Sequence, residues 1–287
     1  MRLRSPLFAP GDSTRKTEKA LASGADAVIF DLEDSVAAGA KDAARAATAA
    51  LLATLDRRDT IVRVNPRGTI WYLADLAAIV AARPAVIMLP KCSGAEDLIA
   101  LDHHLEVLEV ASGQAIGSIA VLPIVTETAA SVLGLPAMAK AGAARRVIGF
   151  CFGAEDLSAD LGIAPRHPDH SYPSAIAHAR NAVLIAAAAA GVPAFDTPWP
   201  DPRDPVGLAR EAATAAADGF AGKMCIHPDQ IGPVNGAFTP DPARIAWAER
   251  VRDGFAANPG AGVFTMDGKM IDRPHLRLAE RILAAAG

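Results

Sequence analysis

The composition of this 287-residue chain is that of a folded globular protein. Hydrophobic residues make up 51% of the chain, which is enough to bury a large core and excludes extensive disorder. The 28 basic and 32 acidic residues give a formal net charge of -4. Because nucleic-acid binders need an excess of positive charge for the phosphates, we expect no nucleic-acid partner.

The sequence also predicts where the protein is found. Residues 1–16 lack the apolar stretch of a signal peptide, and the longest apolar run, residues 182–190, is too short to cross a bilayer. The three cysteines lie far apart in the sequence and form no C-x-x-C pair, which indicates reduced thiols. We therefore expect a cytoplasmic protein that does not interact with membranes.

Short apolar segments alternate with alanine-rich segments of helical length. The predicted strands are residues 6–10, 27–30, 61–64, 85–89, 118–125, 146–152, 192–196 and 222–226. The predicted helices are residues 14–23, 41–55, 71–82, 95–111, 127–141, 172–190 and 205–218. Apolar strands separated by helices are typical of a parallel sheet covered on both faces. Eight strands predict an α/β fold, a (β/α)8 TIM barrel over residues 1–228. An open Rossmann sheet is the alternative, but no G-x-G-x-x-G follows the first strand.

Residues 229–287 have a different pattern and predict a C-terminal helical extension. Two helices are expected within residues 229–257, the second beginning near Pro242 with Asp241 as its N-cap. A hairpin turn at residues 266–269 and a final helix over residues 275–286 complete the chain. Because this extension is too short to build a large core, we expect it to pack on the barrel or, as a lid, on a neighbouring subunit.

Ionisable residues follow nearly every predicted strand, at the end where a barrel carries its active site. In strand order they are Asp31, Glu33, Asp34, Arg63, Lys91, Glu127, Glu155, Asp156, Asp196 and His227, with Asn65 beside Arg63. Any one of them is equally well explained as an ordinary loop charge. Their regular occurrence at strand ends predicts a common site.

Two carboxylates, Glu127 and Asp156, directly follow strongly apolar strands. Two hard oxygen ligands suit Mg²⁺, which completes its octahedron with water and substrate oxygens. Nothing in the sequence supplies the histidine or thiolate spacing of a zinc site. The alternative for Glu127 is a charge that stabilises the start of a helix.

Arg63 lies within an apolar strand, where an unpaired cation is costly to bury. It must therefore pair with a carboxylate or bind an anionic substrate. A purely structural salt bridge with the acidic residues at 31–34 is the alternative.

Segments along nearly the whole chain resemble the HpcH/HpaI aldolase and citrate lyase β-subunit family. They are residues 4–45, 63–76, 88–94 (MLPKCSG), 123–132 (PIVTETAASV), 149–162 (GFCFGAEDLSADLG), 222–231 (GKMCIHPDQI) and 268–282. Residues 164–173 depart from the family pattern. The resemblance implies a TIM barrel, Mg²⁺ or another divalent cation, and reversible carbon–carbon cleavage of β-hydroxyacyl thioesters such as citryl-, malyl- or citramalyl-CoA.

The resemblance also assigns roles to individual residues. It implies Glu127 and Asp156 as metal ligands, Arg63 as the residue that binds the substrate carboxylate, and Asp272 as an acid/base that reaches a neighbour's active site. We further assign catalytic roles to Arg63, Glu33 and Asp34, and substrate binding to Glu127. The HpcH-type aldolases of this family lack such a long C-terminal tail, so its presence in this chain favours the thioester branch, in which CoA is part of the substrate. Arg4, Arg15 and Lys19 surround the first strand and are the expected contacts for the CoA phosphates.

The resulting hypothesis is a Mg²⁺-dependent lyase that releases an α-keto acid and an acyl-CoA and assembles as a homotrimer or hexamer. A metal-dependent class II aldolase acting on free 4-hydroxy-2-oxo acids is the main alternative. A phosphate-binding isomerase and a non-catalytic assembly subunit are weaker ones, because the loop after the seventh strand lacks glycines and Glu127, Asp156 and Arg63 are all present. The sequence leaves the acyl group open, and an acyl carrier protein in place of CoA is not indicated.

Overall fold

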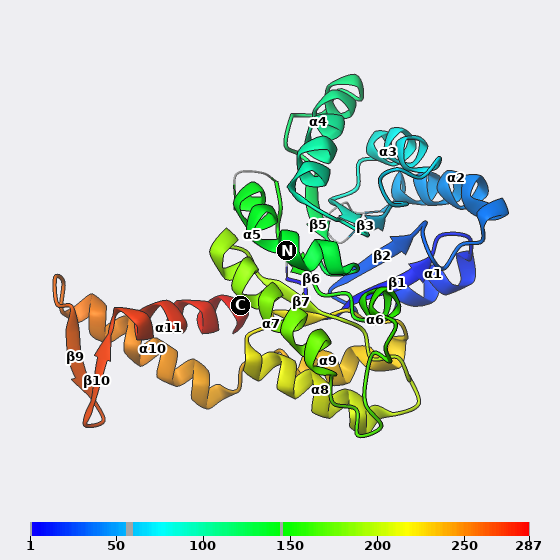
Figure 1. The fold of residues 1–287 in the computed structure, drawn as a ribbon. Coiled ribbons are helices and arrows are strands. Elements are labelled where there is room, and N and C mark those ends of the chain that lie inside the picture. Colours follow the sequence, from blue (N-terminus) through cyan, green and yellow to red (C-terminus); the bar gives the residue numbers. More distant parts are fainter. Residues whose placement is uncertain (1, 56–59, 144–145, 287) are drawn as a thin grey trace.

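A computed structural model describes residues 2–55, 60–143 and 146–286 of the chain (Figure 1). The strands are β1 (Pro6–Pro10), β2 (Ala27–Asp31), β3 (Thr60–Arg63), β4 (Val86–Leu89), β5 (Ala120–Pro123), β6 (Phe150–Cys151), β7 (Ala194–Asp196), β8 (Gly222–Lys223), β9 (Val263–Met266) and β10 (Lys269–Asp272). The helices are α1 (Thr14–Leu21), α2 (Lys41–Leu52), α3 (Tyr72–Ala81), α4 (Ala95–Ala111), α5 (Ala129–Ala143), α6 (Glu155–Leu161), α7 (Ser174–Ala190), α8 (Pro205–Asp218), α9 (Ile231–Ala237), α10 (Pro242–Ala257) and α11 (Arg273–Ala286).

Strands β1 to β8 form two parallel sheets with helices on their outer side. One sheet has the order β1-β2-β3-β4-β5 and the other β6-β7-β8. Isolated bridges connect the two sheets at both ends: Ile124 pairs with Cys151, and Leu7 pairs with Cys225. The N–H of Phe8 donates to the carbonyl of Cys225 at 2.9 Å, which extends the contact between β1 and the end of β8. The expected α/β class with parallel strands is confirmed.

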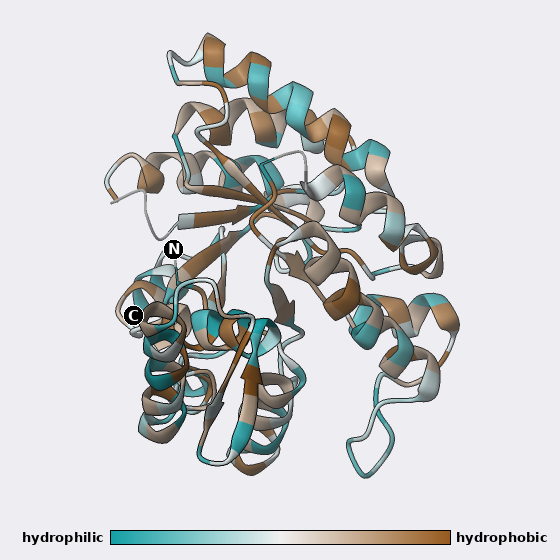
Figure 2. Ribbon diagram, turned by 90° about the vertical axis from the view of Figure 1, so that its left-hand side faces the viewer, coloured by the Kyte–Doolittle hydropathy of each residue, from teal (hydrophilic) through white to brown (hydrophobic). Residues whose placement is uncertain are grey.

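Side chains alternate between two apolar layers along these strands. In β2, Ala27 and Ile29 belong to an inner cluster formed by the strands themselves, whereas Val28 and Phe30 pack against the helices. Figure 2 shows the apolar strands at the centre and the mixed apolar and polar surfaces of the helices around them. Because successive residues of a strand point to opposite faces, a polar residue at a strand end points either toward the inner cluster or toward the helices, according to its position in the strand.

The same alternation explains why Asp196 does not join the other ionisable residues at the strand ends. Phe195 belongs to the inner cluster, so Asp196 points outward to the helix layer. There its carboxylate accepts hydrogen bonds from Lys223 Nζ at 2.9 Å and from Arg180 Nε at 3.1 Å. Burial would raise the pKa of Asp196, but these two cations outweigh it and hold the pKa below its usual value. Asp196 is therefore a structural ion-pair partner.

The C-terminal residues form an arm with its own small core. Helices α10 and α11 and the β9–β10 hairpin project away from the sheets (Figure 1). Their buried apolar residues form a separate cluster that includes Val251, Phe255, Ile271 and Ile282. The predicted N-cap of α10 is confirmed, since Asp241 Oδ1 accepts from the N–H of Arg244 at 2.8 Å. The predicted turn also lies between the paired strands β9 and β10.

Two differences from the sequence-based expectations concern the segment that follows β5. The strand expected over residues 146–152 is shortened to Phe150–Cys151, and the helix α6 was not expected. Helix α6 is terminated by its C-cap residue Gly162, whose φ of 68° is left-handed. With only seven residues, the helix is too short to show a helical period in the sequence. No helix in the described residues is both long enough and apolar enough to span a membrane.

The buried pair of Lys223 and Asp196 predicts a large stability effect. Replacing Lys223 by Met leaves the Asp196 carboxylate, which has no exposed surface, without its ammonium partner. We expect the free energy of unfolding to fall by about 3–5 kcal/mol in urea denaturation. As a control, Arg203→Ala removes a cation that is 91% exposed, and we expect a change within about 0.5 kcal/mol. Equal stability of Lys223→Met and wild type would show that the buried pair is dispensable.

Candidate active site

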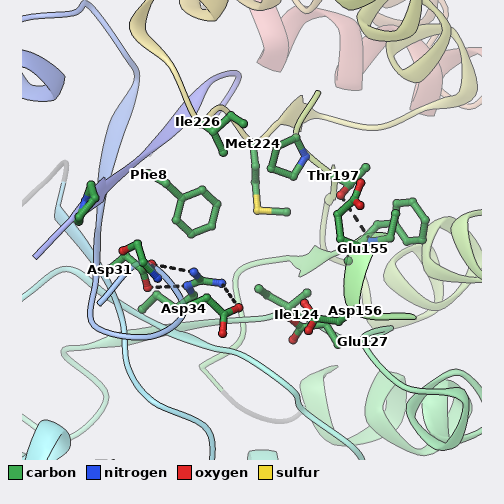
Figure 3. Close-up of a pocket in the computed structure, with 17 residues that line it drawn as sticks. Phe8, Asp31, Asp34, Ile124, Glu127, Glu155, Asp156, Thr197, Met224 and Ile226 are labelled. Atoms are coloured by element: carbon green, nitrogen blue, oxygen red, sulfur yellow. Dashed lines mark hydrogen bonds and ion pairs between the residues drawn. The ribbon is translucent and has the colours of Figure 1, made fainter. Parts of the chain in front are cut away.

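A cavity of about 460 Å³ lies where β1 to β8 end. Its ionisable lining residues include Asp31, Asp34, Arg63, Glu127 and Asp156, so the structure brings together most of the residues that the sequence placed at the strand ends. In Figure 3, Glu127 and Asp156 lie close together on one side, and Asp31 and Asp34 lie on the other. The remaining wall is mostly apolar and includes Phe8, Pro10, Ile124, Phe152, Pro198, Met224 and Ile226, together with the polar residues Ser35, Glu155 and Thr197.

Arg63 reaches the cavity because of its position in β3. Ile61 faces the inner cluster, so Arg63, two residues later, points to the same side at the strand end. Its Nε and Nη2 donate to the two oxygens of Asp31 at 2.7 Å each, and its Nη1 lies 2.8 Å from Glu33 Oε2. Burial would lower the pKa of Arg63, but Asp31 and Glu33 outweigh it and hold the pKa above its usual value. The guanidinium also lies 4.8 Å from the ring centre of Phe8.

The acidic turn at residues 31–34 is held in place by backbone hydrogen bonds and by Lys41. Asp31 accepts from the N–H groups of Glu33 at 2.9 Å and Ser35 at 3.1 Å, which is a local turn. Lys41 Nζ donates to the carbonyls of Leu32 at 2.8 Å and Glu33 at 2.7 Å. Burial raises the pKa of Glu33, and Arg63 and Lys91 offset only part of this effect. Glu33 is therefore a buried carboxyl held between two cations, beside the cavity.

Glu127 and Asp156 are the residues that can hold a metal ion. Glu127 is 3% exposed and accepts a hydrogen bond from the backbone N–H of Lys91, while Asp156 lies in the first turn of α6. Burial and the nearby charge of Glu33 raise the pKa of Glu127 to about 8, and Asp156 adds to the shift. A divalent cation bound between the carboxylates would offset the repulsion among Glu127, Glu33 and Asp156. In the described residues no group of three His, Cys, Asp or Glu side chains is arranged around a metal position. Two carboxylates fit Mg²⁺, which takes its other ligands from water and substrate.

Four of the residues proposed from the sequence do not line this cavity. Asp272 lies in the arm, where its Oδ1 is 2.6 Å from Nδ1 of His275. Arg4 lies before β1, at the opposite end of the strand, and pairs with Asp26 at 2.7 Å. Arg15 and Lys19 are exposed on α1, which follows the cavity end of β1.

Several residues around the site were not identified from the sequence. The apolar wall and Lys41 are the clearest cases, together with Arg166. The guanidinium of Arg166 lies 4.9 Å from the ring centre of Tyr172 and 5.2 Å from that of Trp199, and it pairs with Glu155 at 3.1 Å. The alternation of inner and outer residues could have placed Met224 on the inner face, two residues after Gly222. No local pattern marks Lys41 or Arg166, because their partners are distant in the sequence.

Comparisons with known proteins show which family the chain resembles. The HpcH/HpaI aldolase/citrate lyase family model matches residues 4–228. A citrate lyase subunit beta-like protein of Mycobacterium tuberculosis is 38% identical over 282 residues, covering 98% of this chain and 94% of that protein. The mitochondrial citramalyl-CoA lyase of Mus musculus is 34% identical over 298 residues, covering 99% of this chain and 86% of that protein.

A solved structure is similar over the whole chain. The crystal structure of the protein CitE from Mycobacterium tuberculosis, in complex with magnesium, acetoacetate and coenzyme A, has a TM-score of 0.79 and 36% sequence identity. The match covers 100% of this chain and 98% of that chain. The resemblance seen in the sequence motifs is thus confirmed, and the chain belongs to the HpcH/HpaI aldolase/citrate lyase family.

Proposed function

We propose that this protein is a Mg²⁺-dependent carbon–carbon lyase that cleaves a β-hydroxyacyl-CoA thioester into an α-keto acid and an acyl-CoA, in a reversible reaction. The observation that carries the proposal is the convergence of Glu127, Asp156 and Arg63 on one cavity. The similar CitE protein was crystallised with magnesium, acetoacetate and coenzyme A, which supports the same classes of ligand here.

We further propose that residues 1–228 form a closed (β/α)8 barrel and that residues 229–287 form a separate extension. The bridges that connect β5 to β6 and β1 to the end of β8 support closure. The end of the family match at residue 228 supports the boundary, although the apolar residues of α9 pack in the main core and the separate apolar cluster begins in α10. The cysteines Cys92, Cys151 and Cys225 are free and buried, which supports a cytoplasmic location.

Each group of residues around the cavity has its own role in the proposed reaction. Glu127 and Asp156 would hold Mg²⁺, which supplies positive charge that polarises the carbonyl oxygen of the α-keto acid. Arg63, held in place by Asp31, orients the carboxylate of that acid through its guanidinium. The buried Glu33 and the neighbouring Asp34 hold Arg63 and Lys91 in position beside the reacting atoms. The apolar wall excludes water from the enolate that forms on the acyl-CoA carbon.

Cleavage releases the proton of the substrate's hydroxyl group as the keto group forms, and condensation takes a proton up again at that oxygen. A proton must also be given to the acyl-CoA carbon in cleavage and removed from it in condensation. We propose that Asp272 exchanges this proton in the cavity of an adjacent subunit. Its position in an arm that projects away from the sheets supports this assignment (Figure 1). A closed homotrimer or hexamer would complete every site in the same way, because symmetry repeats each contact.

The exposed cations of α1 are the proposed contacts for the CoA phosphates. Arg15 and Lys19 are exposed on the helix that follows the cavity end of β1. Arg4, which the sequence grouped with them, has its guanidinium engaged by Asp26 and Thr239, so we propose that Arg15 and Lys19 carry this role without it.

The proposed reaction predicts metal-dependent release of products from CoA esters. With Mg²⁺ present, citryl-, malyl- or citramalyl-CoA should yield an α-keto acid, measured by coupled reduction, and chelation should abolish the yield. Glu127→Ala and Asp156→Ala should each lower kcat/KM more than about a hundredfold, since the metal's charge is worth several kcal/mol in the transition state. Turnover of free 4-hydroxy-2-oxo acids in place of all three thioesters would instead identify a class II aldolase.

Gly153 provides a second prediction, because it packs directly against Glu127. A Cβ added at Gly153 would lie 2.7 Å from Cγ of Glu127 and 3.0 Å from Cγ2 of Ile124. We expect Gly153→Ala to displace the Glu127 carboxylate, weaken Mg²⁺ binding in calorimetry, and lower the free energy of unfolding by about 1–3 kcal/mol. Gly232→Ala is the control, because a Cβ there meets nothing within 4 Å. Unchanged Mg²⁺ affinity in Gly153→Ala would contradict the assignment of Glu127 as a ligand.

A shared active site predicts complementation between inactive variants. Asp272→Asn supplies an intact barrel and Glu127→Ala supplies an intact arm. After subunit exchange at equal amounts, about a quarter of the sites should combine Glu127 from one chain with Asp272 from another and regain activity. Exchange is verified by native mass spectrometry, and each variant exchanged with itself is the control. Full exchange without any recovery would place Asp272 outside the neighbour's site.

A further inference from the structure

Lys91 has an unusual backbone conformation at the centre of the acidic site. It follows β4 in the segment Pro90–Cys92 and has a φ of 49°, in the left-handed region that non-glycine residues rarely adopt. This conformation directs the backbone N–H of Lys91 to the carboxylate of Glu127. The next residue is held by a hydrogen bond from the N–H of Cys92 to the carbonyl of Ile124 at 3.3 Å. Strain of this kind persists only where the surroundings enforce it.

The side chain of Lys91 contacts three carboxylates from two different segments. Its Nζ donates to Glu33, lies 3.4 Å from Asp34 Oδ1, and lies 3.7 Å from Asp156 Oδ1. Burial would lower the pKa of Lys91, but Glu33, Glu127 and Asp156 outweigh it and hold the pKa above its usual value. The side chain is therefore an ammonium ion surrounded by carboxylates, and one of these carboxylates, Asp156, is a proposed metal ligand.

The charges around the cavity do not balance. Asp31, Glu33, Asp34, Glu127 and Asp156 lie there with Arg63 and Lys91. Glu155 also lines the cavity but pairs with Arg166, and Lys41 adds one more cation beside the acidic turn, so the carboxylates still outnumber the cations. Arg63 is engaged by Asp31 and Glu33, so Lys91 is the cation nearest to the side chain of Asp156 among the described residues. An ammonium ion 3.7 Å from a carboxylate oxygen partly neutralises that oxygen, and it also repels any second cation that binds there.

We propose that Lys91 is a positioning residue that acts as the internal counter-cation of the metal site. Its ammonium group stabilises the crowded carboxylates in the metal-free protein and competes with Mg²⁺ for Asp156. Mg²⁺ therefore binds the free protein weakly, and it binds tightly only together with an anionic α-keto acid, whose negative charge offsets the repulsion between Mg²⁺ and the ammonium group. This inference rests on the proposed metal site at Glu127 and Asp156.

The sign of the effect on Mg²⁺ affinity tests the proposal. Lys91→Met and Lys91→Asn remove the ammonium group but retain the backbone N–H that Glu127 accepts, and Asn tolerates the left-handed conformation. Isothermal titration calorimetry with MgCl2 should show that both variants bind Mg²⁺ at least about tenfold more tightly than wild type. The repulsion between the ammonium group and a divalent cation at this range is worth at least this factor, even with the dielectric constant of water. Lys91→Arg should restore wild-type affinity.

Two further measurements separate the counter-cation role from a purely structural one. Metal-free Lys91→Met should melt at a lower temperature than wild type, and Mg²⁺ should raise its Tm more than it raises that of wild type. Pyruvate, the probe for the α-keto acid, should tighten Mg²⁺ binding strongly in wild type and only weakly in Lys91→Met. Lys140→Met is the matched control, since it removes an exposed lysine from the last turn of α5 and should change none of these values.

Each outcome has a distinct meaning. Mg²⁺ binding that is unchanged or weaker in both Lys91→Met and Lys91→Asn overturns the counter-cation role. Wild-type Mg²⁺ affinity that persists in Glu127→Ala and Asp156→Ala overturns the proposed metal site instead, and the inference about Lys91 falls with it. If Lys91→Met does not fold, the Lys91→Asn titration decides between these results.

Discussion

Side-chain alternation along parallel strands is the constraint on which the rest of this structure depends. Each strand packs one set of side chains among the other strands and the next set against the helices, so both sets must be apolar along its length. Polar groups are therefore confined to the strand ends. There, a side chain that follows an inner residue by two positions points inward, and one that follows it by a single position points toward the helices. Arg63 follows the inner residue Ile61 by two positions and reaches the cavity. Asp196 follows the inner residue Phe195 by one position and is turned toward the helices.

This constraint concentrates charge, and the two resulting clusters differ in how their charges balance. The outer cluster pairs Asp196 with Lys223 and Arg180, and all three side chains are buried, so its ion pairs stabilise the fold. The inner cluster has more carboxylates than cations and surrounds an open cavity, and the pKa of Glu127 is raised to about 8 there. A site with excess negative charge and space beside it is suited to cations and to ligands that bring cations with them.

Much of the fold could be predicted from the sequence, because it depends on local patterns. The apolar strands, the alanine-rich helices, the N-cap at Asp241 and the turn between β9 and β10 all follow from spacing and composition. The convergence of Asp31, Arg63, Glu127 and Asp156 was predictable because parallel strands bring their carboxyl ends to one side. The short helix α6 carries no full helical period, and it was missed. Lys41 and Arg166 were missed because their roles depend on carbonyls, rings and carboxylates that only the folded chain brings near them.

The separate apolar cluster of the arm has a consequence for how this protein can change over evolutionary time. The cluster is built from residues of α10, β9, β10 and α11, which are contiguous in the sequence after residue 241. A genetic rearrangement with its breakpoint between α9 and α10 would exchange the arm as a unit without disturbing the packing of the strands. Since the strands tolerate no insertion that shifts their alternation, recombination at this junction offers a route to variation that substitutions within the strands do not.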